Sequence, residues 1–313
     1  MNRVVISGSG RVYRNLALEE TLFAGLKRGQ CILYLWVNDS TVVLGNNQCA
    51  YLECSREFCE EHGIAVARRR SGGGAVYQDR GNLNFTFLYW QGEIAEEAIF
   101  TVVRSVVGEL VERPVEISGN DFLVDGRKIS GMAYYGEDGK MLLHGTLLVD
   151  VDLEAMSGAL TVGAKKLQSN GVDSVKKRVA NLREYTPRAT VGLIRQQLKA
   201  KFLEAFGEGE TVWLKEEDMP SEYARYMAPE WVYGESPDCE MVIEAAAARG
   251  IYQLVFRVEQ ERVTGARLYS DTEENEDHTR FLECVEGAVY REQEISAALE
   301  RYLAARVDSA RVI

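Results

Sequence analysis

The sequence is poor in several residues whose abundance marks particular protein classes. Only five prolines occur in 313 residues, which excludes a proline-rich linker or tail. Three histidines, and six cysteines without a Cys-x-x-Cys pair, form no zinc site of the usual spacing. No apolar run approaches the ~18 residues of a membrane helix, and the first residues lack a signal-peptide core. We therefore expect a globular, cytoplasmic protein without a membrane partner.

Positive charge is also scarce. Lysine and arginine total 36 against 48 aspartates and glutamates, for a net charge of −12. Residues 1–182 hold 20 basic and 22 acidic side chains, whereas residues 183–313 hold 16 and 26. Because no basic stripe could neutralise a phosphate backbone, nucleic acid is not an expected partner. The short basic clusters at 68–70 and 176–178 instead indicate a small anionic ligand.

Apolar residues make up 46% of the chain, enough for a sizeable core. Apolar residues recur at helical spacing in segments 15–26, 99–110 and 190–206. Strands are expected at 31–37, 41–44, 64–66, 82–90, 121–124, 127–135 and 141–150. This order predicts an α/β (α+β) fold with a mixed sheet flanked by helices. Behind a polar connector, two strands at 251–270 and two helices at 278–305 indicate a smaller α+β domain, so we place the domains at 1–245 and 246–313.

The strongest motif is residues 68–84, Arg-Arg-Arg-Ser-Gly-Gly-Gly-Ala-Val-Tyr-Gln-Asp-Arg-Gly-Asn-Leu-Asn. Consecutive glycines let backbone N–H groups approach an anion closely, and arginines add charge-assisted hydrogen bonds to phosphate or carboxylate. The segment lies between two strands and lacks Gly-Lys-Ser/Thr, so it is neither a P-loop nor a dinucleotide fingerprint. A triple glycine alone would be read as a turn, but the flanking arginines favour an anion site.

Three further segments carry candidate residues. In residues 119–133, Lys128 lies between strand residues and could neutralise a carboxylate or an α-phosphate. His144 and Gly145 begin an apolar strand, and a basic stretch occupies residues 163–181. Taken singly, each has a simpler explanation: a solvated lysine at a hairpin, a structural histidine and a solvated loop.

Together the segments 68–84, 120–131, 144–148 and 174–182 resemble the lipoate–protein ligase A family of the biotin/lipoate ligase superfamily. The resemblance covers residues 15 to about 182 and continues loosely through Trp231, Gly234 and Pro237. It implies a catalytic domain of that superfamily's fold and a small accessory domain. It also implies a two-step reaction: lipoate and ATP form lipoyl-adenylate, and a lysine of an apo lipoyl domain or of glycine-cleavage H protein then takes the lipoyl group.

The resemblance further implies roles for individual residues. Lys128 is implied as the catalytic residue, touching both the carboxylate and the α-phosphate, and Asp121 is implied to hold Mg²⁺ with Asn120. The residues implied to bind ATP or lipoyl-adenylate are Arg69, Ser71, Gly72, Gly73, Gly74, Ala75, Val76, Tyr77, Asn84, Asn120, Lys128, His144 and Gly145. The basic stretch 163–181 resembles the family's loop that closes over the adenylate.

Three departures from the family pattern and two alternatives remain. Gly119 stands where an arginine is sometimes seen before Asn-Asp, and Cys49 stands where the family often has asparagine. Gln78 stands where the family usually has histidine, and glutamine cannot carry charge. An ATP-independent octanoyl- or lipoyl-transferase would need a cysteine nucleophile. None of the six cysteines lies in the four segments, and Cys49 is the one to test. A non-catalytic lipoate- or carrier-binding protein would be expected to lack Lys128 or Arg69, and both are present.

Overall fold

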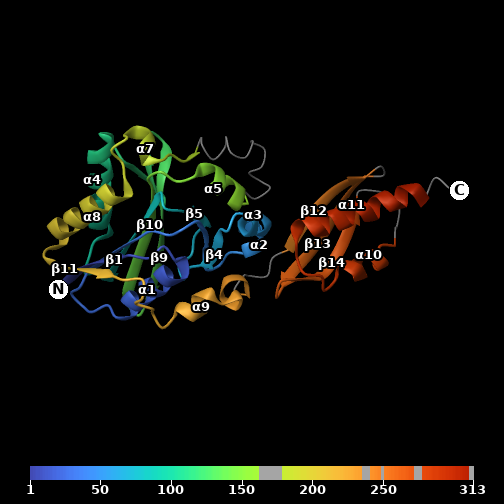
Figure 1. Ribbon diagram of the computed structural model, residues 1–313, viewed down its shortest axis with the longest axis horizontal. Coiled ribbons are helices and arrows are strands. Elements are labelled where there is room, and N and C mark those ends of the chain that lie inside the picture. The colour runs from blue at the N-terminus through green and yellow to red at the C-terminus, as the bar shows by residue number, and fades with distance from the viewer. Residues whose placement is uncertain (162–177, 235–239, 248–249, 271–276, 310–313) are drawn as a thin grey trace. The chain divides into compact units, whose positions relative to one another are not determined.

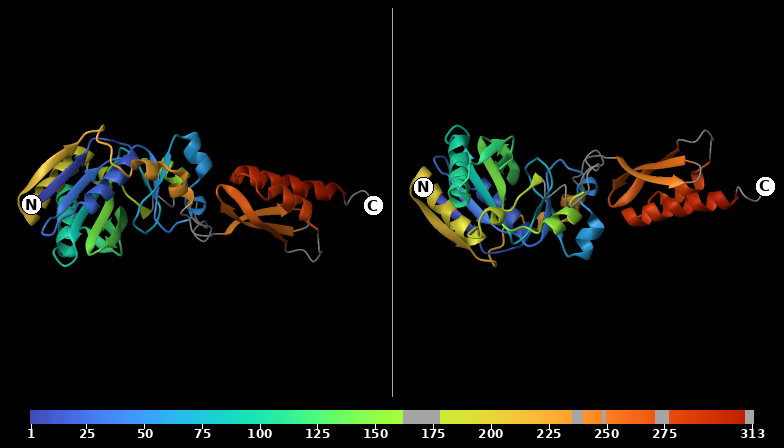
Figure 2. Two further views of the ribbon diagram at one scale, coloured as in Figure 1. Left: turned by 90° about the horizontal axis from the view of Figure 1, so that it is seen from below. Right: turned by 90° about the horizontal axis from the view of Figure 1, so that it is seen from above.

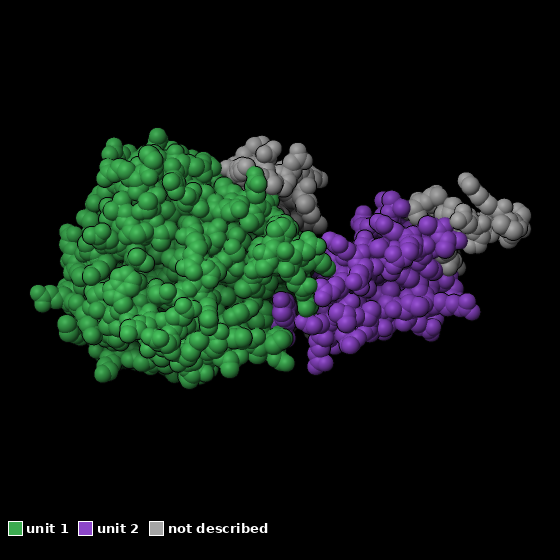
Figure 3. Space-filling model, in the orientation of Figure 1, with its two compact units in different colours: residues 1–232 green, residues 233–313 purple. Residues whose placement is uncertain are grey.

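The computed structural model describes residues 1–161, 178–234, 240–247, 250–270 and 277–309 (Figure 1). The chain divides into two compact units, residues 1–232 and 233–313, which are coloured separately in Figure 3. In the part of the chain described, no helix is both long enough and apolar enough to cross a membrane.

A mixed sheet of eight strands organises the first unit, in the order β11-β1-β2-β6-β10-β9-β8-β7. Strands β11, β1 and β2 run parallel, and each later neighbour is antiparallel. The strands are β1 (Asn2–Ser7), β2 (Ile32–Trp36), β6 (Asn82–Trp90), β7 (Glu116–Ser118), β8 (Asp121–Val124), β9 (Arg127–Glu137), β10 (Lys140–Leu148) and β11 (Gly209–Leu214). The predicted mixed sheet is thus confirmed.

A second, three-stranded sheet in the same unit has the order β4-β3-β5. Its strands are β3 (Thr41–Leu44), β4 (Ala65–Arg68) and β5 (Val76–Gln78). The sequence correctly predicted strands on both sides of residues 38–40, but β2 and β3 do not pair with each other. Every residue of both strands is buried, and each strand finds its partners in a different sheet.

Two hydrophobic cores cover the two faces of the large sheet. One face packs against helices α4 (Glu96–Val111) and α8 (Val191–Phe206), which lie side by side (Figure 2). The other packs against α1 (Val12–Ala24) and the small sheet. Residues therefore alternate between the two cores along each strand: Leu33 and Leu35 join the first core, and Tyr34 and Trp36 join the second.

The first unit also has shorter helices, α2 (Ala50–Glu53), α3 (Arg56–Glu61), α5 (Leu153–Ala159), α7 (Leu182–Tyr185) and α9 (Tyr223–Met227), and a π-helical turn spans Glu230–Gly234.

The second unit has an antiparallel sheet with helices, as the sequence predicted, but with one more strand. Its elements are β12 (Glu240–Ala247), β13 (Gly250–Glu259), β14 (Arg262–Ser270), α10 (Thr279–Val285) and α11 (Glu292–Ser309). The sequence-based boundary at 245/246 would cut β12, which pairs with β13 along its whole length. Glutamates and alanines dominate β12, so its composition resembles a polar connector more than a strand.

Two Asp-Gly turns set the register around the site. Asp125 and Gly126 have φ values of 51° and 73°, and Asp138 and Gly139 have 50° and 77°. Consecutive left-handed residues form the two-residue hairpin turn whose twist matches that of the flanking strands. The turns predicted from sequence are confirmed, and they fix β8 against β9 and β9 against β10.

Candidate functional site

A cavity of about 200 Å³ is lined by residues of α1, both sheets and the glycine-rich loop. Eleven of the fourteen residues predicted from the sequence lie on its wall: Arg69, Gly73, Gly74, Ala75, Val76, Asn84, Asn120, Asp121, Lys128, His144 and Gly145. Eight wall residues were not on that list: Leu16, Trp36, Val43, Gln78, Gly131, Met132, Ala133 and Thr146. The fold therefore brings three of the four motifs to one place, and no residue of 178–182 lines the cavity. Residues 162–177, which include the start of the fourth motif, lie outside the described part of the chain.

Arg69 shapes the glycine-rich loop from behind. Its Nη2 donates to the carbonyl oxygens of Gly72 at 2.6 Å and Gly74 at 2.9 Å, and its Nη1 donates to Val43 O at 3.1 Å. A peptide's C=O and the next N–H point in opposite directions, so the N–H groups of Gly73 and Ala75 point away from the guanidinium. Burial lowers the pKa of Arg69 to about 10, which leaves it charged at neutral pH.

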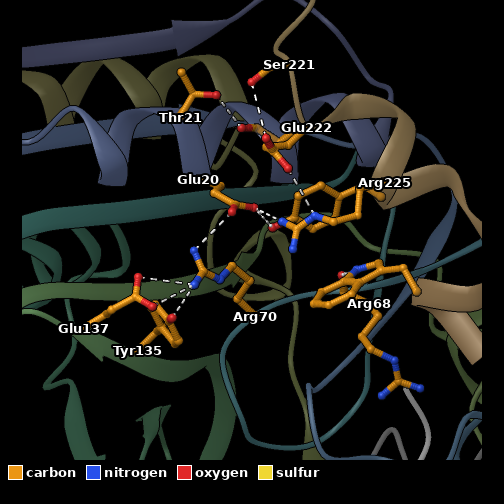
Figure 4. Close-up of polar contacts among 12 residues, drawn as sticks. Glu20, Thr21, Arg68, Arg70, Tyr135, Glu137, Ser221, Glu222 and Arg225 are labelled. Carbon is orange, nitrogen blue, oxygen red and sulfur yellow. Dashed lines mark hydrogen bonds and ion pairs between the residues drawn. The ribbon is translucent and has the colours of Figure 1, made fainter. Parts of the chain in front are cut away.

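The other two arginines of the run do not line the cavity. Arg68 is fully buried, and its guanidinium donates to the carbonyl oxygens of Gly45 at 2.9 Å and Val232 at 2.9 Å. Arg70 points elsewhere, to the carboxylates of Glu20 at 3.2 Å and Glu137 at 3.3 Å (Figure 4). The expectation that the whole run supplies charge to a ligand is therefore wrong for Arg68 and Arg70, because protein groups occupy both guanidiniums.

A buried chain of polar side chains holds Ser71 and His144. Ser71 Oγ accepts from Arg69 Nε at 2.9 Å and lies 2.7 Å from His144 Nε2. His144 Nδ1 lies 2.9 Å from Glu19 Oε1, and since a carboxylate only accepts, Nδ1 carries the proton. Thr86 Oγ1 also donates to Glu19 at 2.6 Å. Ser71 thus acts through Arg69 and His144 and does not line the cavity. Nothing in the sequence pattern pointed to Glu19.

An irregularity in β9 places Lys128 in the cavity. Leu123 pairs with Lys128, but two residues earlier Asp121 pairs with Gly131, so β9 contains one extra residue, a β-bulge. The bulge brings the Lys128 side chain onto the same face as Gly131. A Cβ at Gly131 would lie 2.9 Å from Lys128 Nζ, so only glycine leaves room for the ammonium there. Lys128 Nζ is paired with Asp121 Oδ1 at 2.8 Å, and both side chains are about one-third exposed.

Alternation along β5 decides which of its residues reach the cavity. Val76 and Gln78 line the wall, whereas Tyr77 between them is buried on the opposite side. Tyr77, predicted to contact the nucleotide, therefore does not present its side chain to this wall. Gly72 also lies off the wall, although its carbonyl shapes the loop.

Apart from Ala75 and Val76, the apolar part of the wall was not predicted. Leu16, Trp36, Val43, Met132 and Ala133 contribute it from α1, β2, β3 and β9. The signal available was strand periodicity, because Trp36 and Val43 both point toward the core shared by α1 and the small sheet. The cavity therefore combines an apolar wall with a lysine, an arginine and backbone N–H groups, which suits a ligand with an apolar chain and an anionic head.

The structure describes both flanks of the basic stretch. Thr161 N donates to Glu53 O at 3.0 Å before it, and Ala180 N, at its described end, donates to Lys128 O at 2.9 Å. The chain thus comes back to the cavity and bonds to the backbone of Lys128.

Cys49 is buried at the start of α2, and no cysteine lines the cavity among the described residues.

Gly45 gives a direct test of the loop geometry. A Cβ there would lie 2.0 Å from the carbonyl oxygen of Gly73, so Gly45→Ala must push the glycine-rich loop. Overpacking of this kind costs about 1–3 kcal/mol, and we expect ATP to bind about 10- to 100-fold more weakly, as measured by calorimetry. The control is Gly192→Ala on α8, where a Cβ would meet nothing within 4 Å. Equal ATP affinity in both variants would mean that the loop does not hold the nucleotide.

Comparison with known proteins identifies a matching family and a related protein of the same kind. Residues 11–206 match the family described as the lipoyl protein ligase A/B catalytic domain. A lipoate–protein ligase A of Blochmanniella floridana is 32% identical over 282 residues, covering 86% of this chain and 83% of that protein.

Two solved structures are similar in fold. A bi-partite lipoate protein ligase of Thermoplasma acidophilum, studied with its E2 lipoyl domain, is 26% identical with a TM-score of 0.64, and covers 75% of this chain and 97% of that one. A lipoate–protein ligase A bound with ATP is 25% identical with a TM-score of 0.61, and covers 75% and 99%. With the matched cavity motifs, these findings show that the chain belongs to the lipoyl protein ligase A/B catalytic domain family.

Proposed function

We propose that the chain is an ATP-dependent lipoate–protein ligase, which forms lipoyl-adenylate and passes the lipoyl group to a protein lysine. The observation that carries the proposal is the composition of this cavity. Its apolar wall suits the lipoyl chain, and Lys128 with the glycine-rich loop suits a carboxylate and phosphates. The 32% identical relative named lipoate–protein ligase A supports the same activity.

In the first step, a carboxylate oxygen of lipoate attacks the α-phosphorus of ATP, and pyrophosphate leaves. Both reactants are anions, so a cation between them lowers the barrier to their approach. Lys128 is placed for this role, because its ammonium is held at 2.8 Å from Asp121 and against Gly131 on the cavity wall. The N–H groups of Gly73 and Ala75 point away from Arg69 and would donate hydrogen bonds to phosphate oxygens.

In the second step, the amine of an acceptor lysine attacks the acyl carbon and AMP leaves. An acyl-adenylate hydrolyses in water, so the apolar wall serves to limit the access of solvent. The relative from Thermoplasma acidophilum was studied with its E2 lipoyl domain. We propose apo lipoyl domains of 2-oxoacid dehydrogenases, or glycine-cleavage H protein, as the acceptors here.

Mg²⁺ would enter with the nucleotide. Magnesium commonly uses one or two carboxylates together with substrate phosphates and water. Asp121 and the Asn120 amide lie on the cavity wall and fit that limited set. Among the described residues no group of three or more His, Cys, Asp or Glu side chains could hold a metal, which is consistent with an ion carried mainly by ATP. When bound, the ion would neutralise phosphate charge.

The transferase alternative finds less support. Such an enzyme needs an activated cysteine beside the acyl group. No cysteine lines the cavity in the described part of the chain. Lys128 and Arg69, whose loss would favour a non-catalytic binding protein, both lie on the wall.

The proposed reaction can be tested directly. The full chain is incubated with ATP, Mg²⁺, lipoate and apo lipoyl domain, and the acceptor is weighed by mass spectrometry. We expect an acceptor heavier by one lipoyl group, and lipoyl-AMP when the acceptor is omitted. Modification that proceeds without ATP from a lipoylated carrier would support the transferase instead.

We further propose that the second unit serves transfer more than adenylation. The described cavity is lined entirely by residues before position 147, and the Thermoplasma acidophilum relative is described as bi-partite. A chain of residues 1–234, which keeps the Arg68–Val232 contact, is expected to fold and to form lipoyl-AMP. We expect its transfer to apo lipoyl domain to slow by more than about tenfold, because the acceptor loses any docking surface that the second unit offers. Circular dichroism and separate assays of each half-reaction check this; ligation at the full rate would contradict it.

A further inference from the structure

A row of buried side-chain amides runs from α1 to the cavity. Asn15 Nδ2 donates to Asn38 Oδ1 at 2.8 Å, and Asn38 Nδ2 donates to Gln78 Oε1 at 2.7 Å. Asn15 and Asn38 are fully buried, and Gln78 is 3% exposed. Each amide has one donating and one accepting end, so the orientation of one fixes the orientation of the next.

Two backbone carbonyls fix the direction of the row. Asn15 Nδ2 lies 3.1 Å from Ser9 O and 3.2 Å from Val37 O, and carbonyl oxygens only accept. At its other end, Asn15 Oδ1 accepts from the Ser7 hydroxyl at 2.7 Å. Asn15 must therefore present its NH₂ to Asn38, which in turn must present its own NH₂ to the next amide.

A second asparagine reaches the same oxygen from β6. Asn84 Nδ2 donates to Gln78 Oε1 at 3.1 Å, and Asn84 Oδ1 accepts from Asn82 Nδ2 at 3.1 Å. Both lone pairs of the Gln78 oxygen are thus occupied within the protein. Asn84 also lines the cavity, and its hydrogen bond helps to hold the Gln78 oxygen in place.

The side-chain nitrogen of Gln78 has no hydrogen-bond acceptor among the described residues. Gln78 lines the cavity, and no described residue accepts a hydrogen bond from its Nε2. Gln78 Nε2 is not one of the fully buried polar atoms that lack a partner. Because it has no protein acceptor in the described part of the chain, it must be accessible from the cavity. The row of amides can present only N–H to a ligand at this point.

We propose that Gln78 Nε2 is a fixed hydrogen-bond donor to an anionic oxygen of the reacting ligand, with Asn15, Asn38 and Asn84 as its positioning residues. The inference rests on the proposed function, because the acceptor is a carboxylate oxygen of lipoate or a phosphoryl oxygen of ATP. A primary amide does not titrate, so the donor is present at every working pH. The charged and titratable side chains on the same wall are Arg69, Asp121, Lys128 and His144.

The test is Gln78→Glu in the full chain, assayed by lipoate-dependent ATP–pyrophosphate exchange. A carboxylate keeps the shape and still accepts from Asn38 and Asn84, but when ionised it has no hydrogen to donate. We expect kcat/KM to fall by about 10- to 100-fold at pH 8, the range for a lost hydrogen bond to a charged group.

A second variant leaves the cavity wall untouched. In Asn38→Asp the side chain at 38 can no longer donate, so the Gln78 amide should turn and present its oxygen to the ligand. We expect a loss of exchange comparable to that of Gln78→Glu, with a thermal midpoint showing a folded protein. The control is Gln30→Glu, which makes the same change at an exposed side chain bonded to Met1 O.

Calorimetry separates the two sources of the acceptor oxygen. Weaker binding of lipoate alone by Gln78→Glu assigns the carboxylate, and weaker binding of ATP alone assigns a phosphoryl oxygen; either supports the proposal. A folded Gln78→Glu within threefold of the parent at pH 8 overturns it while leaving the ligase function standing. A parent chain that exchanges no pyrophosphate with lipoate and ATP overturns both.

Discussion

Replacement of Lys128 by alanine is expected to slow lipoate-dependent ATP–pyrophosphate exchange by about 150- to 1000-fold, which corresponds to about 3–4 kcal/mol for one preorganised charge in a water-poor site. The ammonium lies on the cavity wall beside Asp121, and Gly131 leaves the space it occupies. Because the Lys128 side chain is 36% exposed and its partner is similarly open, its removal should leave the fold intact. Circular dichroism and the thermal midpoint check the fold.

The matched control is Lys201→Ala on α8, which removes an exposed ammonium paired with Glu109 at 3.1 Å. It should exchange pyrophosphate at the parent rate. Gly131→Ala supplies an independent test, because its Cβ would displace the Lys128 ammonium without removing it. A Lys128→Ala enzyme within tenfold of the parent would remove the lysine from the reaction.

The site was largely predictable because its motifs depend on local backbone chemistry. The Asp125-Gly126 turn requires left-handed residues, and the glycines at 72–74 permit a close approach of backbone to ligand. The bulge after Lys128 could not be read from the sequence, since nothing there marks an extra residue in β9. The bulge nevertheless decides that the ammonium shares a face with Gly131.

Buried polar residues were the main failure of the sequence-based analysis. Asn15 and Glu19 lie four residues apart on α1, a spacing that is usually a solvated face. Both are buried because distant partners satisfy them: Asn38 bonds to the first, and His144 and Thr86 to the second. Pairing over such separations depends on tertiary structure, and one sequence does not contain it.

The pairing of strands could not be predicted from the sequence for the same reason. The strand at 41–44 was predicted with its bounds, yet it joins a second sheet and not the strand before it. Strand β12 was overlooked because its glutamates and alanines carry little β signal, and its burial comes from pairing with β13 and packing against α11. The predicted domain boundary at 245/246 followed from that omission.

Arg69→Ala is expected to lower kcat/KM for ATP by about 30- to 150-fold, or about 2–3 kcal/mol for the charge-assisted hydrogen bonds lost. The guanidinium donates to Ser71 Oγ and to the carbonyl oxygens of Val43, Gly72 and Gly74. Without it, those carbonyls lose their partner and the N–H groups of the loop lose their direction. Steady-state exchange with ATP varied at saturating lipoate measures the effect.

Arg69→Lys distinguishes shape from charge. A lysine keeps the positive charge but, as a compact ammonium with three donors, cannot reproduce a planar fork that serves four acceptors. If Arg69 acts by shaping the loop, as its contacts indicate, Arg69→Lys should lose nearly as much activity as Arg69→Ala. Recovery to within threefold of the parent would show that charge at this position suffices. Arg104→Ala, which breaks an exposed 3.3 Å pair with Glu97 on α4, controls for the loss of an arginine and should not change the rate.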